Sequence, residues 1–119
     1  MSTRRVWGYR VNWIRMESRD IYNRTRREID WEDNWIHIGI GNDMNLSLIK
    51  SEISNQFENQ QTVLLKRGRT NSKSLQINEV IDEITTLIGK EDFELWNEKF
   101  SKAIKFNKIG VMNKSKYAM

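Results

Sequence analysis

Large apolar residues alternate with polar ones near the start of the chain. Trp7, Tyr9, Val11 and Trp13 follow a period of two, which predicts a half-buried strand from about Val6 to Ile14. The period then lengthens to that of a helix. Residues 17–29 contain no glycine and place Ile21, Tyr22, Thr25 and Ile29 on one side, so they predict an amphipathic helix.

A second strand and a second helix follow in the same order. Residues 35–40 predict a strand with Ile36, Ile38 and Ile40 on one face. Beyond the turn at 41–43, which offers helix caps together with Asn45, an apolar stripe predicts a helix facing the core. The residues of that stripe are Leu46, Ile49, Ile53 and Phe57.

The next segments are a buried strand, a polar loop and the most strongly patterned helix. The apolar run 62–65 is typical of a central strand, and the basic stretch 66–74 of an exposed loop. Residues 77–88 have helical apolar spacing, and Gly89 is placed to end that helix.

Residues 93–96, 103–106 and 109–112 predict further strands, joined by turns at 97–98 and 107–108, before a polar tail that we expect to fray after about residue 113. This order of elements indicates an α/β or α+β fold. We expect one compact two-layer domain over 1–119, with about four to five strands and about three helices.

Composition narrows the functional classes. The chain has one histidine (His37), no cysteine and no proline in 119 residues, which removes thiol nucleophiles, cysteine-based zinc sites and disulfides. No apolar run is long enough to span a bilayer, and no signal sequence follows Met1. We therefore expect a cytoplasmic protein without a membrane partner.

Candidate enzyme chemistry is weak. His37 is the one side chain that titrates near neutral pH, yet no nucleophile or carboxylate forms a recognisable motif with it, which favours a half-exposed strand histidine. The glycines at 39 and 41 lack the remaining residues of a nucleotide-binding loop and indicate a tight turn. We predict no catalytic residues, no cofactor and no metal.

Two basic clusters could contact nucleic acid. The first comprises Arg24, Arg26 and Arg27 and is interspersed with acidic residues, so a solvated helix face is the simpler interpretation. The second, at 66–69, is less compensated and includes Arg67 and Arg69.

Acidic residues surround an aromatic anchor in the middle of the chain. Residues 31–60 hold five acidic residues and one basic residue, although the whole chain has a net charge of +4. Glu32 and Asp33 lie beside Trp31, a combination suited to a hot spot for a basic protein partner. The alternative is a solvated loop with the tryptophan tucked inward, and the sequence leaves the exposure of Trp31 open.

The chain resembles the small immunity proteins of bacterial toxin–immunity systems, including those of contact-dependent inhibition. The resemblance rests on size, a compact α/β plan, the lack of catalytic motifs and the strand–turn–strand ending over 92–112. It transfers no functional residue. One departure is the basic overall charge, because immunity proteins against nucleases are commonly acidic.

We therefore expect a non-enzymatic module that binds and neutralises a cognate protein toxin, using Trp31, Glu32 and Asp33 with Arg67 and Arg69 as a second patch. A small basic nucleic-acid-binding regulator of phage or mobile-element type is the alternative.

Overall fold

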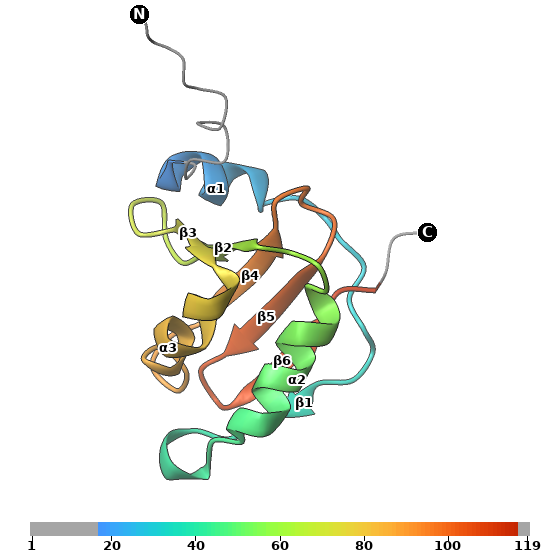
Figure 1. The fold of residues 1–119 in the computed structure, drawn as a ribbon, viewed down its shortest axis with the longest axis vertical. Coiled ribbons are helices and arrows are strands. Elements are labelled where there is room, and N and C mark those ends of the chain that lie inside the picture. Colours follow the sequence, from blue (N-terminus) through green and yellow to red (C-terminus); the bar gives the residue numbers. More distant parts are fainter. Residues whose placement is uncertain (1–16, 117–119) are drawn as a thin grey trace, which may run out of the picture.

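A single antiparallel sheet organises the protein. The computed structural model describes residues 17–116, so the strand predicted over 6–14 lies outside the described residues. The strand order is β1-β6-β5-β4-β2-β3, and every neighbouring pair is antiparallel (Figure 1). The strands are β1 (Ile36–His37), β2 (Thr62–Lys66), β3 (Lys73–Gln76), β4 (Phe93–Asn97), β5 (Ala103–Asn107) and β6 (Val111–Lys114). The fold is therefore α+β, with six strands where four to five were predicted.

Two helices cover one face of this sheet. They are α2 (Leu46–Gln56) and α3 (Val80–Thr85), and short 3-10 turns, η2 (Gly41–Asp43) and η3 (Ile77–Glu79), precede them. Ile49 and Ile53 of α2 and Ile84 of α3 pack with the apolar residues of the strands into the main core. Within that core Phe93 and Phe106 stack with their ring centroids 4.6 Å apart. The apolar spacing of both helices thus predicted their buried faces.

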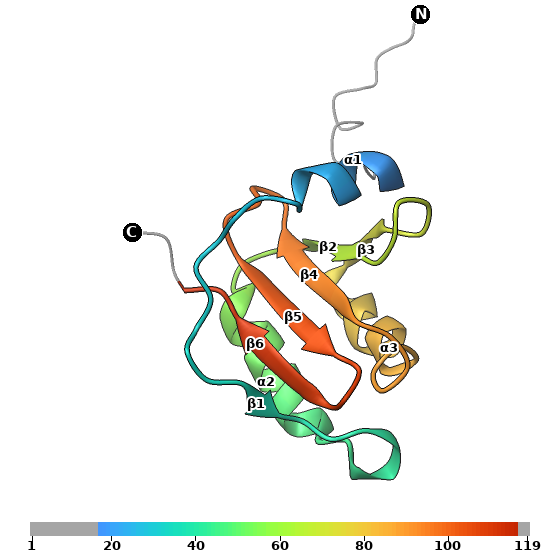
Figure 2. The same cartoon turned by 180° about the vertical axis from the view of Figure 1, so that it is seen from behind.

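The third helix, α1 (Ser18–Arg24), lies at one end of the opposite face (Figure 2). Its buried Ile21 packs in a second, smaller apolar cluster with Leu64, Trp96 and Ala103 of the sheet. The Ser18 hydroxyl fixes the start of α1 to the β2–β3 turn, because it donates to the Arg69 carbonyl and accepts from the Ser72 amide. The rest of this sheet face carries no helix among the described residues.

Helix α1 is shorter than the helix predicted over 17–29. It ends where the Thr25 hydroxyl donates to the carbonyl of Ile21 at 2.8 Å, which satisfies a carbonyl of the last turn. Ile29 still packs against the second cluster, but from an extended segment. Its spacing from Ile21 therefore reflected burial and not a continuing helix.

The strand predicted over 35–40 is also wrong in extent, since β1 is only two residues long. Gly39 has φ +79°, a conformation that ends the extended backbone. Ile38 is buried, whereas Ile40 is 44% exposed beyond the break. Leu46, predicted to face the core, is 42% exposed at the start of α2, where the Asn45 side chain caps the helix as expected.

Three further expectations need correction. Lys73 and Ser74 belong to β3, an edge strand that the polar composition of 66–74 concealed. The helix predicted over 77–88 begins as the turn η3 and has its α-helical part only over Val80–Thr85. Strand β6 extends to Lys114, past the residue where the polar tail was expected to begin, and the buried Ser115 bonds to the start of β5.

Candidate functional site

The acidic segment forms a ridge beside β6. This 30–35 ridge comprises the residues from Asp30 to Trp35, and backbone hydrogen bonds hold it against the chain that leaves β6. The Glu32 amide donates to the Lys114 carbonyl, and the Lys116 amide donates to the Asp30 carbonyl, each at 2.8 Å. The side chain of Asn113 adds a third bond to the Glu32 carbonyl at 3.0 Å. The ridge is thus preorganised by the sheet.

The side chains of the ridge project into solvent. Asp30, Glu32 and Asp33 are exposed, and none of their carboxylates forms an ion pair with a described cation. Trp35 is 46% exposed, a large apolar area for a surface residue. An exposed aromatic ring with charged neighbours has the anatomy of a protein-interface hot spot.

Trp31 differs from Trp35 because it is partly buried. It pairs with Ser115 in an isolated bridge and packs against the second apolar cluster. The Lys105 ammonium lies 4.3 Å from the centroid of its ring and 5.2 Å from that of Trp35. Both tryptophans therefore reach from the ridge across β6 to the same lysine of β5.

The sheet face beside the ridge is built in rows, because the strand register places residues side by side. Leu64, Trp96 and Ala103 form an apolar row under α1. The next row is polar, and no helix of residues 17–116 lies over it; its members are Lys66, Glu94, Lys105 and Asn113. We call this helix-free part of the surface the open face, which Figure 2 shows between α1 and the β5–β6 turn.

A hollow of about 270 Å³ lies on the open face. Its lining residues come from four neighbouring parts of the fold: Trp35, Lys66, Arg67, Asp92, Phe93, Glu94, Lys105, Phe106 and Asn107. The ridge stands on one side of this hollow and the end of β2 on the other. Of the residues predicted from the sequence, Arg67 lines the hollow, whereas Trp31, Glu32, Asp33 and Arg69 do not; the ridge reaches it through Trp35.

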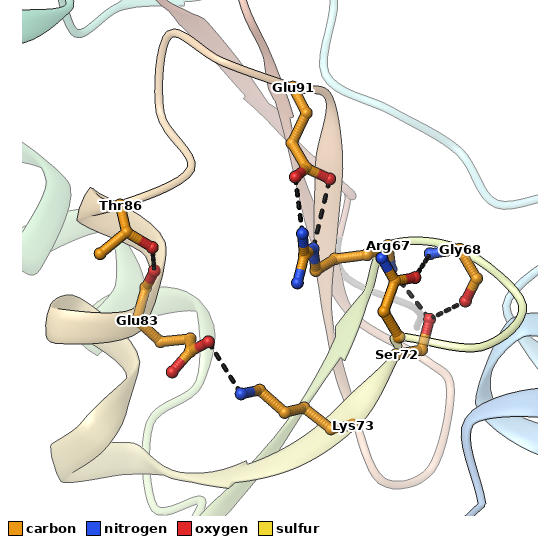
Figure 3. A network of polar contacts seen from close by, with 8 residues as sticks. Arg67, Gly68, Ser72, Lys73, Glu83, Thr86 and Glu91 are labelled. Atoms are coloured by element: carbon orange, nitrogen blue, oxygen red, sulfur yellow. Dashed lines mark hydrogen bonds and ion pairs between the residues drawn. The ribbon is translucent and has the colours of Figure 1, made fainter.

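The arginines of the second patch have different surroundings. Arg67 donates from Nη2 and Nε to the two carboxylate oxygens of Glu91, at 2.7 and 3.2 Å (Figure 3). Its neighbours Lys66 and Lys73 pair with Glu94 and Glu83, at 3.7 and 2.8 Å. Arg69 is exposed and has no ion pair in the described part of the chain.

The hydrogen bonds that Arg67 donates to Glu91 raise the pKa of Arg67 above its ordinary value, against the opposing effect of burial, and the charges of Glu91 and Glu83 add to it. A group with a raised pKa in the folded state loses its stabilising charge only as the pH rises through that pKa. Arg67 therefore keeps its charge throughout the neutral pH range, so deprotonation of the arginine does not break its ion pair with Glu91 in that range.

Sequence reasoning missed Trp35, Lys105 and Asn107 as members of this surface. Lys105 occupies the polar position between Ile104 and Phe106, so alternation alone showed that it faces away from the core. Its contact with the tryptophans depends on the strand order, which brings β1 and β5 to either side of β6. No local pattern in the sequence encodes that order.

His37 lies exposed on β1, and within residues 17–116 no three His, Asp or Glu side chains gather as metal ligands. No helix in the described part of the chain is long and apolar enough to cross a bilayer. Comparison of the chain with known protein families, curated proteins and solved structures gives no match.

Proposed function

We propose that this protein is a non-enzymatic binding module that recognises another protein, as an immunity protein that occludes and neutralises a cognate bacterial toxin. The partner contacts the 30–35 ridge and the adjoining hollow. Asp30, Glu32 and Asp33 attract cationic side chains of the partner, and Trp35 supplies the apolar contact at the centre.

One observation supports this proposal above the others. Trp35 is nearly half exposed. The next residue, Ile36, pairs with Met112 of β6, so the sheet holds the backbone that places Trp35 in this exposed position. Burial of an apolar side chain of this size contributes about 2 kcal/mol to association, and exposed tryptophans are enriched among residues that dominate binding energy. The carboxylates beside it form no ion pair with the cations of residues 17–116, so no ion pair within that part of the chain must break when a cationic partner binds.

The first experiment identifies the partner. The tagged full-length protein is recovered from its native cells at about 150 mM salt, with nuclease treatment, and bound proteins are identified by mass spectrometry. We expect one stoichiometric protein that survives nuclease. Loss of all bound protein on nuclease treatment would contradict the proposal and favour the nucleic-acid-binding alternative.

The second experiment tests the surface with purified partner. Trp35→Ala and the double variant Glu32→Lys with Asp33→Lys are compared with Glu58→Lys, an exposed acidic residue just beyond α2. We expect Trp35→Ala to weaken binding at least tenfold and the charge reversal to slow association, with Glu58→Lys close to wild type. Equal binding by all three variants would move the interface elsewhere.

Neutralisation is tested by growth. The recovered partner is expressed in a surrogate host with and without this protein. Immunity predicts that the partner alone stops growth, that co-expression restores it, and that Trp35→Ala restores it less well than wild type. A partner that is harmless alone would leave a binding module but rule out the immunity role.

A further inference from the structure

Lys105 is a cation held in the hollow by aromatic rings and not by a carboxylate. Its ammonium lies over Trp31 and Trp35, at 4.3 and 5.2 Å from the ring centroids. These cation–π contacts are favourable, but they leave the side of the ammonium that faces away from the rings able to bind an anion. Lys105 forms no ion pair with any carboxylate of residues 17–116.

The neighbouring carboxylate that could have paired with Lys105 is engaged elsewhere. Glu94 is the direct cross-strand neighbour of Lys105 on the same face of the sheet. Its Oε1 accepts from the indole N–H of Trp96 at 2.8 Å and lies 3.7 Å from the Lys66 ammonium. The remaining cations of the hollow, Lys66 and Arg67, are paired with Glu94 and Glu91. Lys105 is therefore the one lining cation that lacks a carboxylate partner among the described residues.

A second donor stands beside Lys105 on the same strand and the same face. The side-chain oxygen of Asn107 accepts from the Ile109 amide at 3.1 Å, which fixes the orientation of the side-chain amide. Its NH₂ group has no partner within residues 17–116. An ammonium and an amide two residues apart on a strand lie about 7 Å apart at their Cα atoms, within reach of a single carboxylate between them.

From this arrangement we infer that the hollow receives an acidic side chain of the protein partner, whose carboxylate binds Lys105 and Asn107 while a neighbouring apolar group covers Trp35. The inference rests on the proposed protein-binding function and adds a chemical requirement to it. The partner presents cationic residues to the 30–35 ridge and one carboxylate to the hollow beside it.

The hollow is better suited to one carboxylate than to a phosphate backbone. Asp92 and Glu94 line it, and the exposed acids of the ridge stand at its side. A single carboxylate meets one free cation and one amide donor, whereas a chain of phosphates would also meet these negative charges. The local charges thus favour a peptide over a nucleic acid.

The test uses two blocked pentapeptides, Ac-Gly-Tyr-Glu-Tyr-Gly-NH₂ and its neutral counterpart with Gln in place of Glu. Each is titrated into the full-length protein while NMR follows the indole N–H of Trp35 and the amide of Lys105. We expect the Glu peptide to bind about three- to fivefold more tightly than the Gln peptide, the range of an exposed ion pair. The difference should vanish in Lys105→Met, which keeps an apolar stem on the tryptophans, and persist in Lys105→Arg.

Lys108→Met is the matched control, because Lys108 is an exposed lysine in the β5–β6 turn that forms no ion pair with a carboxylate of residues 17–116 and lies outside the lining of the hollow. It should keep the preference for Glu. Equal binding of the two peptides, or a preference that survives in Lys105→Met, would overturn the inference. Stronger shifts of the same signals with a short oligothymidine would overturn it in favour of nucleic acid. Partner recovery and the Trp35→Ala result test the binding function separately, so a failure of this inference can be told from a failure of the proposed function.

Discussion

At the scale of single residues, Gly39 is where the backbone leaves β1 and turns toward α2. Its φ of +79° is unfavourable for a side chain, and an added Cβ would overlap the carbonyl oxygen of Asp43. We expect Gly39→Ala to lower the free energy of unfolding by about 2 kcal/mol or more, measured by urea denaturation. Gly41→Ala is the control, since Gly41 also has a positive φ but open space around it. That variant should lose only about 1 kcal/mol, and equal losses would show that the overlap with Asp43 is relieved at no cost.

The two tryptophans of the ridge show what residue-level reasoning could reach. The sequence suggested Trp31 as an aromatic anchor among acidic residues and left its exposure open; in the structure Trp31 is partly buried, and Trp35, which was not proposed, is 46% exposed. The residues next to Trp31 and Trp35 in the sequence show no pattern that would distinguish the partly buried tryptophan from the exposed one. The distinction arises because Trp31 pairs with Ser115 next to the apolar row, while Trp35 lies farther along the ridge beside the polar row.

At the scale of elements, one buried side chain joins α2 to two strands. The Gln56 amide nitrogen lies within hydrogen-bond distance of the carbonyls of Ala103 and Ser115 and of the Ser115 hydroxyl, at 2.9–3.2 Å. Gln56→Leu removes this donor and leaves the Ser115 carbonyl without a donor from residues 17–116, whereas the Ala103 carbonyl and the Ser115 hydroxyl still accept from backbone amides. We expect a loss of about 2 kcal/mol in unfolding free energy. Gln61→Leu changes an exposed glutamine and should stay within about 0.5 kcal/mol of wild type. Similar thermal unfolding of both variants would show that water replaces the Gln56 donor.

The difference between local apolar patterns and contacts between strands explains why the sequence predicted some elements and not others. Helix α2 and strands β2 and β4 carry apolar patterns that match their burial, and the sequence located them. Strand β3 and the last residues of β6 are mostly polar and are held by backbone pairing with the preceding strands β2 and β5. Ser115, for instance, accepts from the Ala103 amide at 2.8 Å, a partner that no local pattern identifies.

At the scale of the whole molecule, the positive net charge is distributed in a way that separates the two functional hypotheses. On the β2–β3 side, Lys66, Arg67 and Lys73 are paired with carboxylates. At the α1 end, residues 17–28 contain four arginines and three acidic residues, all exposed. Mixed signs weaken the attraction to a polyanion, so a net charge of +4 overstates the tendency to bind nucleic acid.

This distribution of charge can be tested by measuring nucleic-acid binding at the α1 end. Arg24, Arg26 and Arg27 are exposed, and replacing all three with Gln removes a cationic cluster that lies outside the 30–35 ridge and the hollow. We expect fluorescence anisotropy to give wild type a Kd no tighter than about 10⁻⁵ M for a labelled oligonucleotide at about 150 mM salt. The triple variant should bind the protein partner as wild type does, because its ridge and hollow are intact. Tight oligonucleotide binding that falls steeply with salt and disappears in the triple variant would instead place the function on the α1 end, since counterion release from phosphates produces that dependence.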